Sequence, residues 1–297
     1  MSHQTLIVYS NSEDPVAACG AACAASQQVS VMHVDELLPF LSTHAWPQIL
    51  ELQVPAEIRD RFRDARIINR VFSLSGTQLI AFLRKHQVDE RWLHIRLQDL
   101  FLLGRSLAHD TGVRGVSKSL LPLNAQWFGI RRALPNLQVP RFSYAFGYER
   151  SDLTEFSSPL QKSVWSLFDW REERHLPASE ADRHQFHVER PIGTPVILYF
   201  LGDDFHTVHF PQEAVDVDHA RIASISCAAR SAFHSELGEV LLYAEGTDLR
   251  FYAFSPYLLS VASKPSFGTE LEEWLRSGRT VNSVEWSDPN AASRFCH

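Results

Sequence analysis

The stretch GEVLLYAEGTDLRFYAFSP, residues 238–256, most narrows the folds open to this chain. Two apolar runs flank Glu-Gly-Thr-Asp, a sequence typical of a tight turn between paired strands. The preceding residues 217–237 carry apolar side chains at spacings of three and four, which predicts an amphipathic helix. We expect Gly238 to end that helix and Ser255-Pro256 to open a new loop. The apolar positions of the predicted helix are Ile222, Ile225, Ala229 and Phe233.

The first half of the chain alternates short apolar runs with helical stretches. Strands that alternate with helices of this length indicate a parallel sheet with crossover connections. Pro15 stands near the start of an Ala-rich helix, where its missing N–H costs little. The predicted strands are 5–10, 29–34, 49–54 and 66–71, and the predicted helices are 15–25, 56–65, 76–86, 92–108 and 124–134.

The second half carries signals of antiparallel strands. Residues 161–170 alternate in polarity, and 184–191 form a strand that Pro191 ends. Residues 194–210 predict a hairpin that turns at Gly202-Asp203-Asp204, and 268–278 predict a last amphipathic helix. We expect an α/β fold of two domains: 1–148 with a mainly parallel sheet, and 149–297 with antiparallel sheets and flanking helices.

Composition excludes several functional classes. The net charge of -7 argues against a nucleic-acid partner, because phosphate neutralisation needs clustered Lys and Arg. No apolar run approaches the roughly 20 residues of a membrane span, and the first residues lack the pattern of a signal peptide. Four cysteines suit a reduced chain better than a disulfide framework. We therefore predict a cytoplasmic protein without a membrane partner.

The order of these segments resembles the glutamate-ligase-like branch of the ATP-grasp superfamily over almost the whole chain. RIINRVFSLSG is similar to a first-domain strand followed by Asn-Arg-Pro, with Val71 in place of the proline. The resemblance implies that Asn69 and Arg70 bind substrate, that Lys162 contacts ATP phosphates and that Glu189 is the adenine-side carboxylate. It also implies ATP and magnesium as cofactors and a peptide or a partner ligase as the partner.

The hairpin resembles the family segment whose Asp, Glu and Asn hold magnesium. In this chain those positions correspond to Val240, Ala253 and Ser255, and a family arginine near the phosphates corresponds to Ile197. Magnesium prefers oxygen ligands, chiefly carboxylates and water, which valine and alanine lack. The resemblance therefore implies a lost metal site and crippled phosphoryl transfer. Glu239 would enter the site only after a one-residue shift of register, which turns every side chain of a strand to the other face.

These observations leave three functional hypotheses open. The first is an ATP-grasp-like pseudoenzyme with no catalytic residues, which binds a peptide, a partner ligase or a nucleotide. The second is an active ATP-dependent carboxylate–amine ligase acting on glutamate or a peptide, with metal ligands among Glu239, Glu245 and Asp248. The third is a plain interaction module with an exposed hydrophobic face.

Plainer interpretations stand beside the candidate residues. Lys162 also suits a solvated strand edge, and Glu189 also suits a surface ion pair with Arg190. Cys19 and Cys23 share a helix face, where free cysteines commonly pack as small hydrophobes. No zinc-binding spacing, nucleophile elbow or Walker-type phosphate loop is present.

Overall fold

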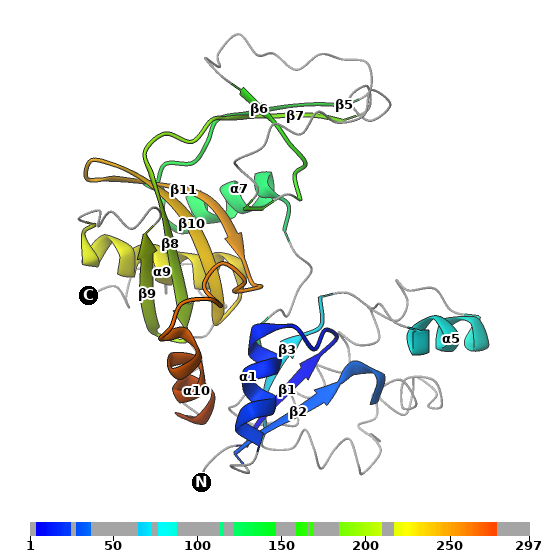
Figure 1. The fold of residues 1–297 in the computed structure, drawn as a ribbon. Coiled ribbons are helices and arrows are strands. Elements are labelled where there is room, and N and C mark those ends of the chain that lie inside the picture. The colour runs from blue at the N-terminus through cyan, green and yellow to red at the C-terminus, as the bar shows by residue number, and fades with distance from the viewer. Residues whose placement is uncertain are drawn as a thin grey trace.

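The computed structural model describes most of the regions in which the sequence predicts structure. The predicted strand 49–54 and the predicted helices 56–65 and 92–108 lie outside the described residues. The described strands form three sheets, and helices pack beside them (Figure 1). The α/β fold class is confirmed. The described residues are 4–24, 28–36, 65–72, 77–87, 113–115, 121–146, 159–165, 167–168, 184–209 and 217–277.

The N-terminal sheet is parallel and has the strand order β2-β1-β3-β4. Helix α1 packs on it so closely that a Cβ added at Gly20 would lie 2.2 Å from Ile7 Cδ1. The Asp14 carboxylate caps α1 by accepting the Val16 and Ala17 N–H groups, directly before Pro15. The elements of this part are β1 (Gln4–Tyr9), α1 (Pro15–Cys23), β2 (Val29–His33), the 3-10 turn η2 (Val34–Glu36), β3 (Ala65–Arg70), α5 (Thr77–His86) and β4 (Val113–Gly115).

The middle sheet is antiparallel and has the order β5-β7-β6. The strand expected over 161–170 ends at Gln161, and the described residues after it are not in a strand. Strand β5 precedes residue 148 and pairs with β7, which follows it, so this sheet draws strands from both sides of the predicted domain boundary. The division at 148 stays a prediction. The elements are β5 (Phe142–Phe146), β6 (Pro159–Gln161) and β7 (His184–Glu189).

The C-terminal sheet is antiparallel and has the order β11-β10-β8-β9. Both predicted hairpins are present, and helix α9 covers one face of the sheet. Helix α7 packs on α9 and reaches β11, where the Trp127 indole N–H donates to the Tyr252 carbonyl at 2.8 Å. The elements are α7 (Leu123–Ala133), β8 (Thr194–Leu201), β9 (Asp204–His209), α9 (His219–Phe233), β10 (Leu237–Glu245), β11 (Asp248–Ser255) and α10 (Phe267–Ser277).

The end of α9 differs from the prediction. The helix stops at Phe233 because His234 takes a left-handed conformation, with φ 50° and ψ 40°. Gly238 instead lies inside β10, where a Cβ would approach Phe254 Cε2 to 2.3 Å. The glycine therefore serves close packing within the sheet, and the αL residue that ends the helix is a histidine.

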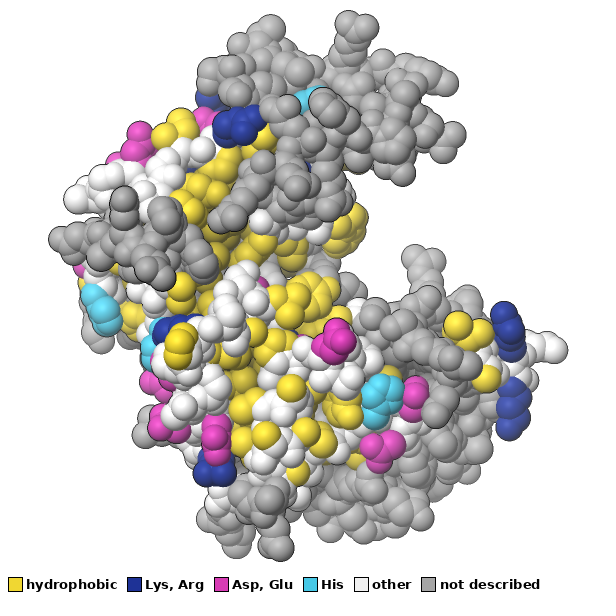
Figure 2. Space-filling view, viewed as in Figure 1, with side chains coloured by type: hydrophobic (Ala, Val, Ile, Leu, Met, Phe, Trp, Pro, Cys, Tyr) yellow, Lys and Arg dark blue, Asp and Glu magenta, His cyan; other side chains and the backbone are white. Residues whose placement is uncertain are grey.

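Helix α10 joins the C-terminal part to the N-terminal sheet. The Thr5 hydroxyl donates to the Leu275 carbonyl at 3.1 Å, and Arg66 Nη1 donates to the Trp274 carbonyl at 3.0 Å. Helix α10 also packs against α1, and buried side chains from both regions belong to one core. Hydrophobic side chains run down the middle of the face in Figure 2. No helix among the described residues is long and apolar enough to cross a membrane.

Candidate functional site

The pairing of β10 with β11 decides which side chains share the candidate metal face. Glu239 pairs with Ser255, Leu241 with Ala253, and Val240 with Phe254. Directly opposed residues point to the same face, and alternate residues along a strand do too. Glu239, Ala253 and Ser255 therefore lie on one face, while Val240 lies on the other. The phenyl ring of Phe254 on that other face stacks on Phe233 of α9, with centroids 4.4 Å apart.

This register corrects one position of the sequence-based mapping. Val240 does not share a face with Ala253 and Ser255, whereas Glu239 does. A bulge between Leu241 and Leu242 shifts the register by one residue, because Leu242 pairs with Phe251 whereas Leu241 pairs with Ala253, and this shift places Glu239 opposite Ser255. The sequence-based mapping was one residue out of phase because a bulge depends on how two strands pair and cannot be read from either strand alone.

Glu239 is buried and holds the loop that follows β11. Its side chain is 1% exposed, and Oε2 accepts the Ser260 N–H at 3.1 Å. Burial raises the pKa of this carboxyl to about 7, although hydrogen bonds with Ser255, Ser260 and Leu259 act in the opposite direction. The carboxylate is thus already engaged by the 256–266 loop.

The described residues of this face do not fit a magnesium ion. Ala253 offers no side-chain oxygen, and the Ser255 hydroxyl already accepts the Tyr257 N–H at 3.2 Å. Magnesium requires near-octahedral oxygen ligation, and one engaged carboxylate provides little of it. Within the described residues, no three His, Cys, Asp or Glu side chains gather as a metal site would require.

Lys162 and Glu189 both belong to the middle sheet. Lys162 follows β6, is 5% exposed, and donates its main-chain N–H to the Phe186 carbonyl at 3.1 Å. Phe186 precedes Glu189 by three residues on β7, which sets the two candidates roughly 10 Å apart along the strand. The side chain of Lys162 is thus enclosed by protein, unlike that of a solvated strand edge.

Glu189 lies in a basic pocket of 370 Å³ at the base of the middle sheet. Its carboxylate accepts Arg141 Nη2 at 3.2 Å and lies 3.6 Å from Arg250 Nη1. Arg131 lines the same pocket, so three guanidinium groups face one carboxylate. This surplus of positive charge suits an anionic ligand group.

Arg70 and Asn69 lie at the carboxyl end of β3. The Arg70 guanidinium is fully buried, pairs with Asp14 at 2.6 Å, and donates to the carbonyls of Pro256 and Tyr257. Asn69 Oδ1 accepts the Val71 N–H at 3.0 Å. Arg70 therefore ties the start of the 256–266 loop to the N-terminal sheet, while Glu239 holds the same loop from the C-terminal sheet.

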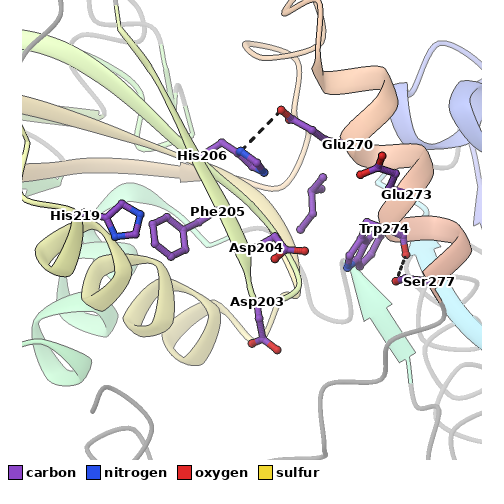
Figure 3. Close-up of a pocket in the computed structure, with 10 residues that line it drawn as sticks. Asp203, Asp204, Phe205, His206, His219, Glu270, Glu273, Trp274 and Ser277 are labelled. Carbon is purple, nitrogen blue, oxygen red and sulfur yellow. Dashed lines mark hydrogen bonds and ion pairs between the residues drawn. The ribbon is translucent and has the colours of Figure 1, made fainter.

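A polar row crosses the C-terminal sheet on the face of Glu239. Glu239 pairs with Tyr199, and Tyr199 pairs with His206. The Tyr199 hydroxyl donates to Glu270 and accepts from Lys264 Nζ at 2.6 Å. His206 Nδ1 lies 3.8 Å from Glu270, as Figure 3 shows. Sequence reasoning missed Asp14, Tyr199, Lys264 and Glu270, because only the pairing of strands distant in sequence brings them together.

Comparison with known proteins identifies the fold. The sequence matches no protein-family model and no curated protein. The structure resembles the ATP-grasp ligase PsnB complexed with precursor peptide PsnA2 and AMPPNP, with a TM-score of 0.62 and 12% identity over 94% of this chain and 98% of that one. It also resembles a RimK domain protein ATP-grasp from Sphaerobacter thermophilus, with a TM-score of 0.58 and 13% identity over 92% and 98% of the two chains.

A third likeness is to the macrocyclase MdnC from Microcystis aeruginosa, bound with its precursor peptide MdnA. The TM-score is 0.53 and the identity 11%, over 93% of this chain and all of that one. The chain therefore has the fold of ATP-grasp ligases along nearly its full length. At these identities the likeness concerns the fold, and the chemistry has to be argued from the residues.

Proposed function

We propose that this protein is an ATP-grasp-like subunit that binds a peptide and has little or no ligase activity of its own. Its fold is similar to that of PsnB and MdnC, both solved with precursor peptides, which supports a peptide partner. The observation that carries the proposal is the face of β10 and β11, where Ala253 and Ser255 accompany one buried carboxylate that the loop already binds.

The lack of metal-ligating side chains at Ala253 and its neighbours argues against ligase activity. Phosphoryl transfer depends mainly on positioning and on neutralising the charge of the phosphates, which the metal ions of such enzymes provide. Glu239 has a pKa of about 7 and is protonated in a large share of molecules at neutral pH, which weakens it further as a cation ligand. The apolar Ile197, 4% exposed, adds no positive charge to this face.

The remaining candidate residues suit binding. We propose that Lys162 contacts the phosphates of a nucleotide, that Glu189 lies on its adenine side, and that Asn69 and Arg70 contribute to the substrate side. Arg70 acts there by fixing the 256–266 loop, because its guanidinium is already engaged by Asp14 and two carbonyls. Cys19, Cys23 and Cys227 are free thiols, in keeping with a cytoplasmic location.

Calorimetric titration with ATP, with and without magnesium, tests this proposal. We expect weak ATP binding that magnesium does not strengthen, and no ADP release when a carboxylate and an amine are added. The variant Lys162→Ala is expected to abolish the binding of ATP, whereas Lys85→Ala, at an exposed position on α5, is the matched control. Tight magnesium-dependent binding together with ADP release would refute the proposal.

The position of Glu239 favours an active carboxylate–amine ligase as the second candidate. Its carboxylate lies on the face that the metal-ligand positions share. Glu245 and Asp248 do not join it: they face each other at the turn of the hairpin, and Glu245 is six residues from Glu239, roughly 20 Å along the strand. If the protein is an active ligase, Glu239→Gln removes the release of ADP; in our proposal there is no release to remove.

A further inference from the structure

A cavity of 480 Å³ opens at the β9 edge of the C-terminal sheet, next to the polar row formed by Glu239, Tyr199 and His206. One wall is the β8–β9 hairpin and the other is α10, with the first residue of α9 at one end (Figure 3). The lining residues are Leu201, Asp203, Asp204, Phe205, His206, His219, Glu270, Glu273, Trp274 and Ser277.

The cavity has an excess of negative charge. Asp203 pairs with Arg230 at 2.6 Å, and Glu270 pairs with Lys264 at 3.2 Å. Asp204 and Glu273 lie on opposite walls and have no ion-pair or hydrogen-bond partner within the described part of the chain. Figure 2 shows acidic and histidine side chains, with a few basic ones among them, at this edge of the molecule, where Figure 1 places β9 and α10. Two unpaired carboxylates facing one cavity favour a cationic ligand group.

Trp274 supplies an independent sign of a ligand. Its side chain is buried, with 5% exposure, and lines the cavity. Its indole Nε1–H has no acceptor among the residues that the structure describes, and the nitrogen is not fully enclosed by protein. The ring is held firmly: the Arg66 guanidinium lies 3.9 Å from its centroid, and the nitrogen lies against Gly202. A fixed donor at the wall of a cavity favours a ligand that also carries an acceptor.

Two aromatic rings, on the side of β9 opposite to Asp204, complete the lining. The rings of Phe205 and His219 lie 5.0 Å apart, and both lie at the wall of the cavity. Long basic side chains commonly pack their methylene groups on such surfaces while the charged end reaches polar partners. Aromatic rings also attract a cation placed over their faces.

We propose that this cavity binds a basic residue of a polypeptide. The ammonium or guanidinium group lies between Asp204 and Glu273, the stem lies between the β8–β9 hairpin and α10, and a neighbouring main-chain carbonyl accepts from Trp274 Nε1. A free polyamine shares the cationic chemistry but lacks the carbonyl. The inference does not depend on the proposed function, because Asp204, Glu273 and Trp274 are not among the candidate metal positions.

The position of the cavity also favours a polypeptide. Strand β9, which supplies Asp204, Phe205 and His206, is at the edge of the C-terminal sheet in the described chain. An edge strand offers main-chain N–H and carbonyl groups to which an extended peptide adds readily. Main-chain pairing there would direct one side chain of the peptide toward the hairpin and α10.

The test is a titration of the whole chain, labelled with ¹⁵N, by the peptide acetyl-Gly-Lys-Gly-amide. The chain has seven tryptophans, and the variant Trp274→Phe identifies the indole signal of Trp274. Acetyl-Gly-norleucine-Gly-amide has a similar apolar stem without the charge, and cadaverine is the free diamine. We expect the lysine peptide alone to produce a saturable shift of the Trp274 indole signal.

Charge-removing variants test the two carboxylates. Asp204→Asn and Glu273→Gln are each expected to weaken binding of the lysine peptide about fivefold, and the double variant about twentyfold. Glu245→Gln, an exposed acid at the β10–β11 turn, is the matched control and should leave the affinity unchanged. Because these side chains are at the surface, the variants should fold normally.

Three outcomes would overturn the proposal. One is equal binding of the norleucine peptide, and another is unchanged affinity in the double variant. The third is tighter binding of cadaverine than of the lysine peptide, which would assign the cavity to a free amine. Binding of the lysine peptide that weakens as salt is added, with the Trp274 signal shifted, would support it.

Discussion

Glu239 shows how a buried carboxylate can have a structural role. Its side chain is enclosed, and its oxygen is bound by the Ser260 N–H. Enclosure disfavours the charged form, while the hydrogen bond favours it, and burial is the larger effect on the pKa. The result is a group that titrates near neutrality inside the fold.

The stability of the protein should therefore depend on pH through this residue. The folded pKa of about 7 exceeds the ordinary value of 4.5, so the folded state binds more protons between these values. The stabilising contribution is complete below 4.5 and is lost as the pH rises through 7. We expect Glu239→Gln to be more stable than the native chain by about 2 to 3 kcal/mol at about pH 8, and to differ little at about pH 5.

Urea unfolding at the two pH values measures this difference. Glu245→Gln, at an exposed position, should show no dependence of its effect on pH and serves as the control. An equal effect of Glu239→Gln at both pH values would contradict the burial of an ionisable carboxyl at this position.

At the scale of elements, the end of α9 illustrates a local conformation that the neighbouring structure imposes. His234 has φ 50°, although left-handed backbone is unfavourable for residues with a Cβ. The helix has to turn there because β10 begins at Leu237, three residues later. Tertiary packing thus holds a residue in a conformation that glycine would adopt more easily.

Two variants at this position isolate the backbone effect. His234→Gly and His234→Ala both remove the imidazole, but only alanine retains a Cβ that opposes the left-handed conformation. We expect the glycine variant to be more stable than the alanine variant by about 1 kcal/mol, measured by urea unfolding. A more stable alanine variant would show that the helix end differs from the one described. The same pair at His219, the first helical residue of α9, is the control, and there alanine should be at least as stable.

For the whole molecule, α10 is the element that couples the N-terminal sheet to the C-terminal part. Its main-chain carbonyls accept from Thr5 and Arg66 of two N-terminal strands, and Leu275 is 1% exposed. Arg70 adds a second connection through the Pro256 carbonyl. These contacts belong to one core, so the two regions should lose structure together.

The variant Leu275→Ala tests this coupling. Truncating a buried leucine costs about 2 to 5 kcal/mol, and we expect amide hydrogen exchange to accelerate in β1 and in β10 by the same factor. Ile80→Ala, at a residue 48% exposed on α5, is the control and should change neither. Faster exchange in β10 with unchanged exchange in β1 would show that the two regions unfold independently.

The sequence predicted much of the fold because its signals are local. The apolar runs of β1, β2 and β3 and the turns of the two C-terminal hairpins are visible in neighbouring residues, and the structure has them. Where a prediction depended on a boundary, it was less accurate: the glycine expected to stop α9 lies within β10. Gly238 met the local rule for a helix stop, but the position needs a glycine because a Cβ there would collide with Phe254 on the neighbouring strand.

The candidate site was less predictable, because it depends on which residues face each other. The sequence alone determined that residues 238–256 form a hairpin and that the side chain of Ala253 cannot ligate a metal, since it contains no oxygen. Only the tertiary structure decided that Glu239 shares the face of Ala253 and Ser255, and that the 256–266 loop occupies its carboxylate. The physical reason is that strand register and loop docking are set by contacts between segments far apart along the chain, whereas periodicity and turn chemistry are set by neighbours.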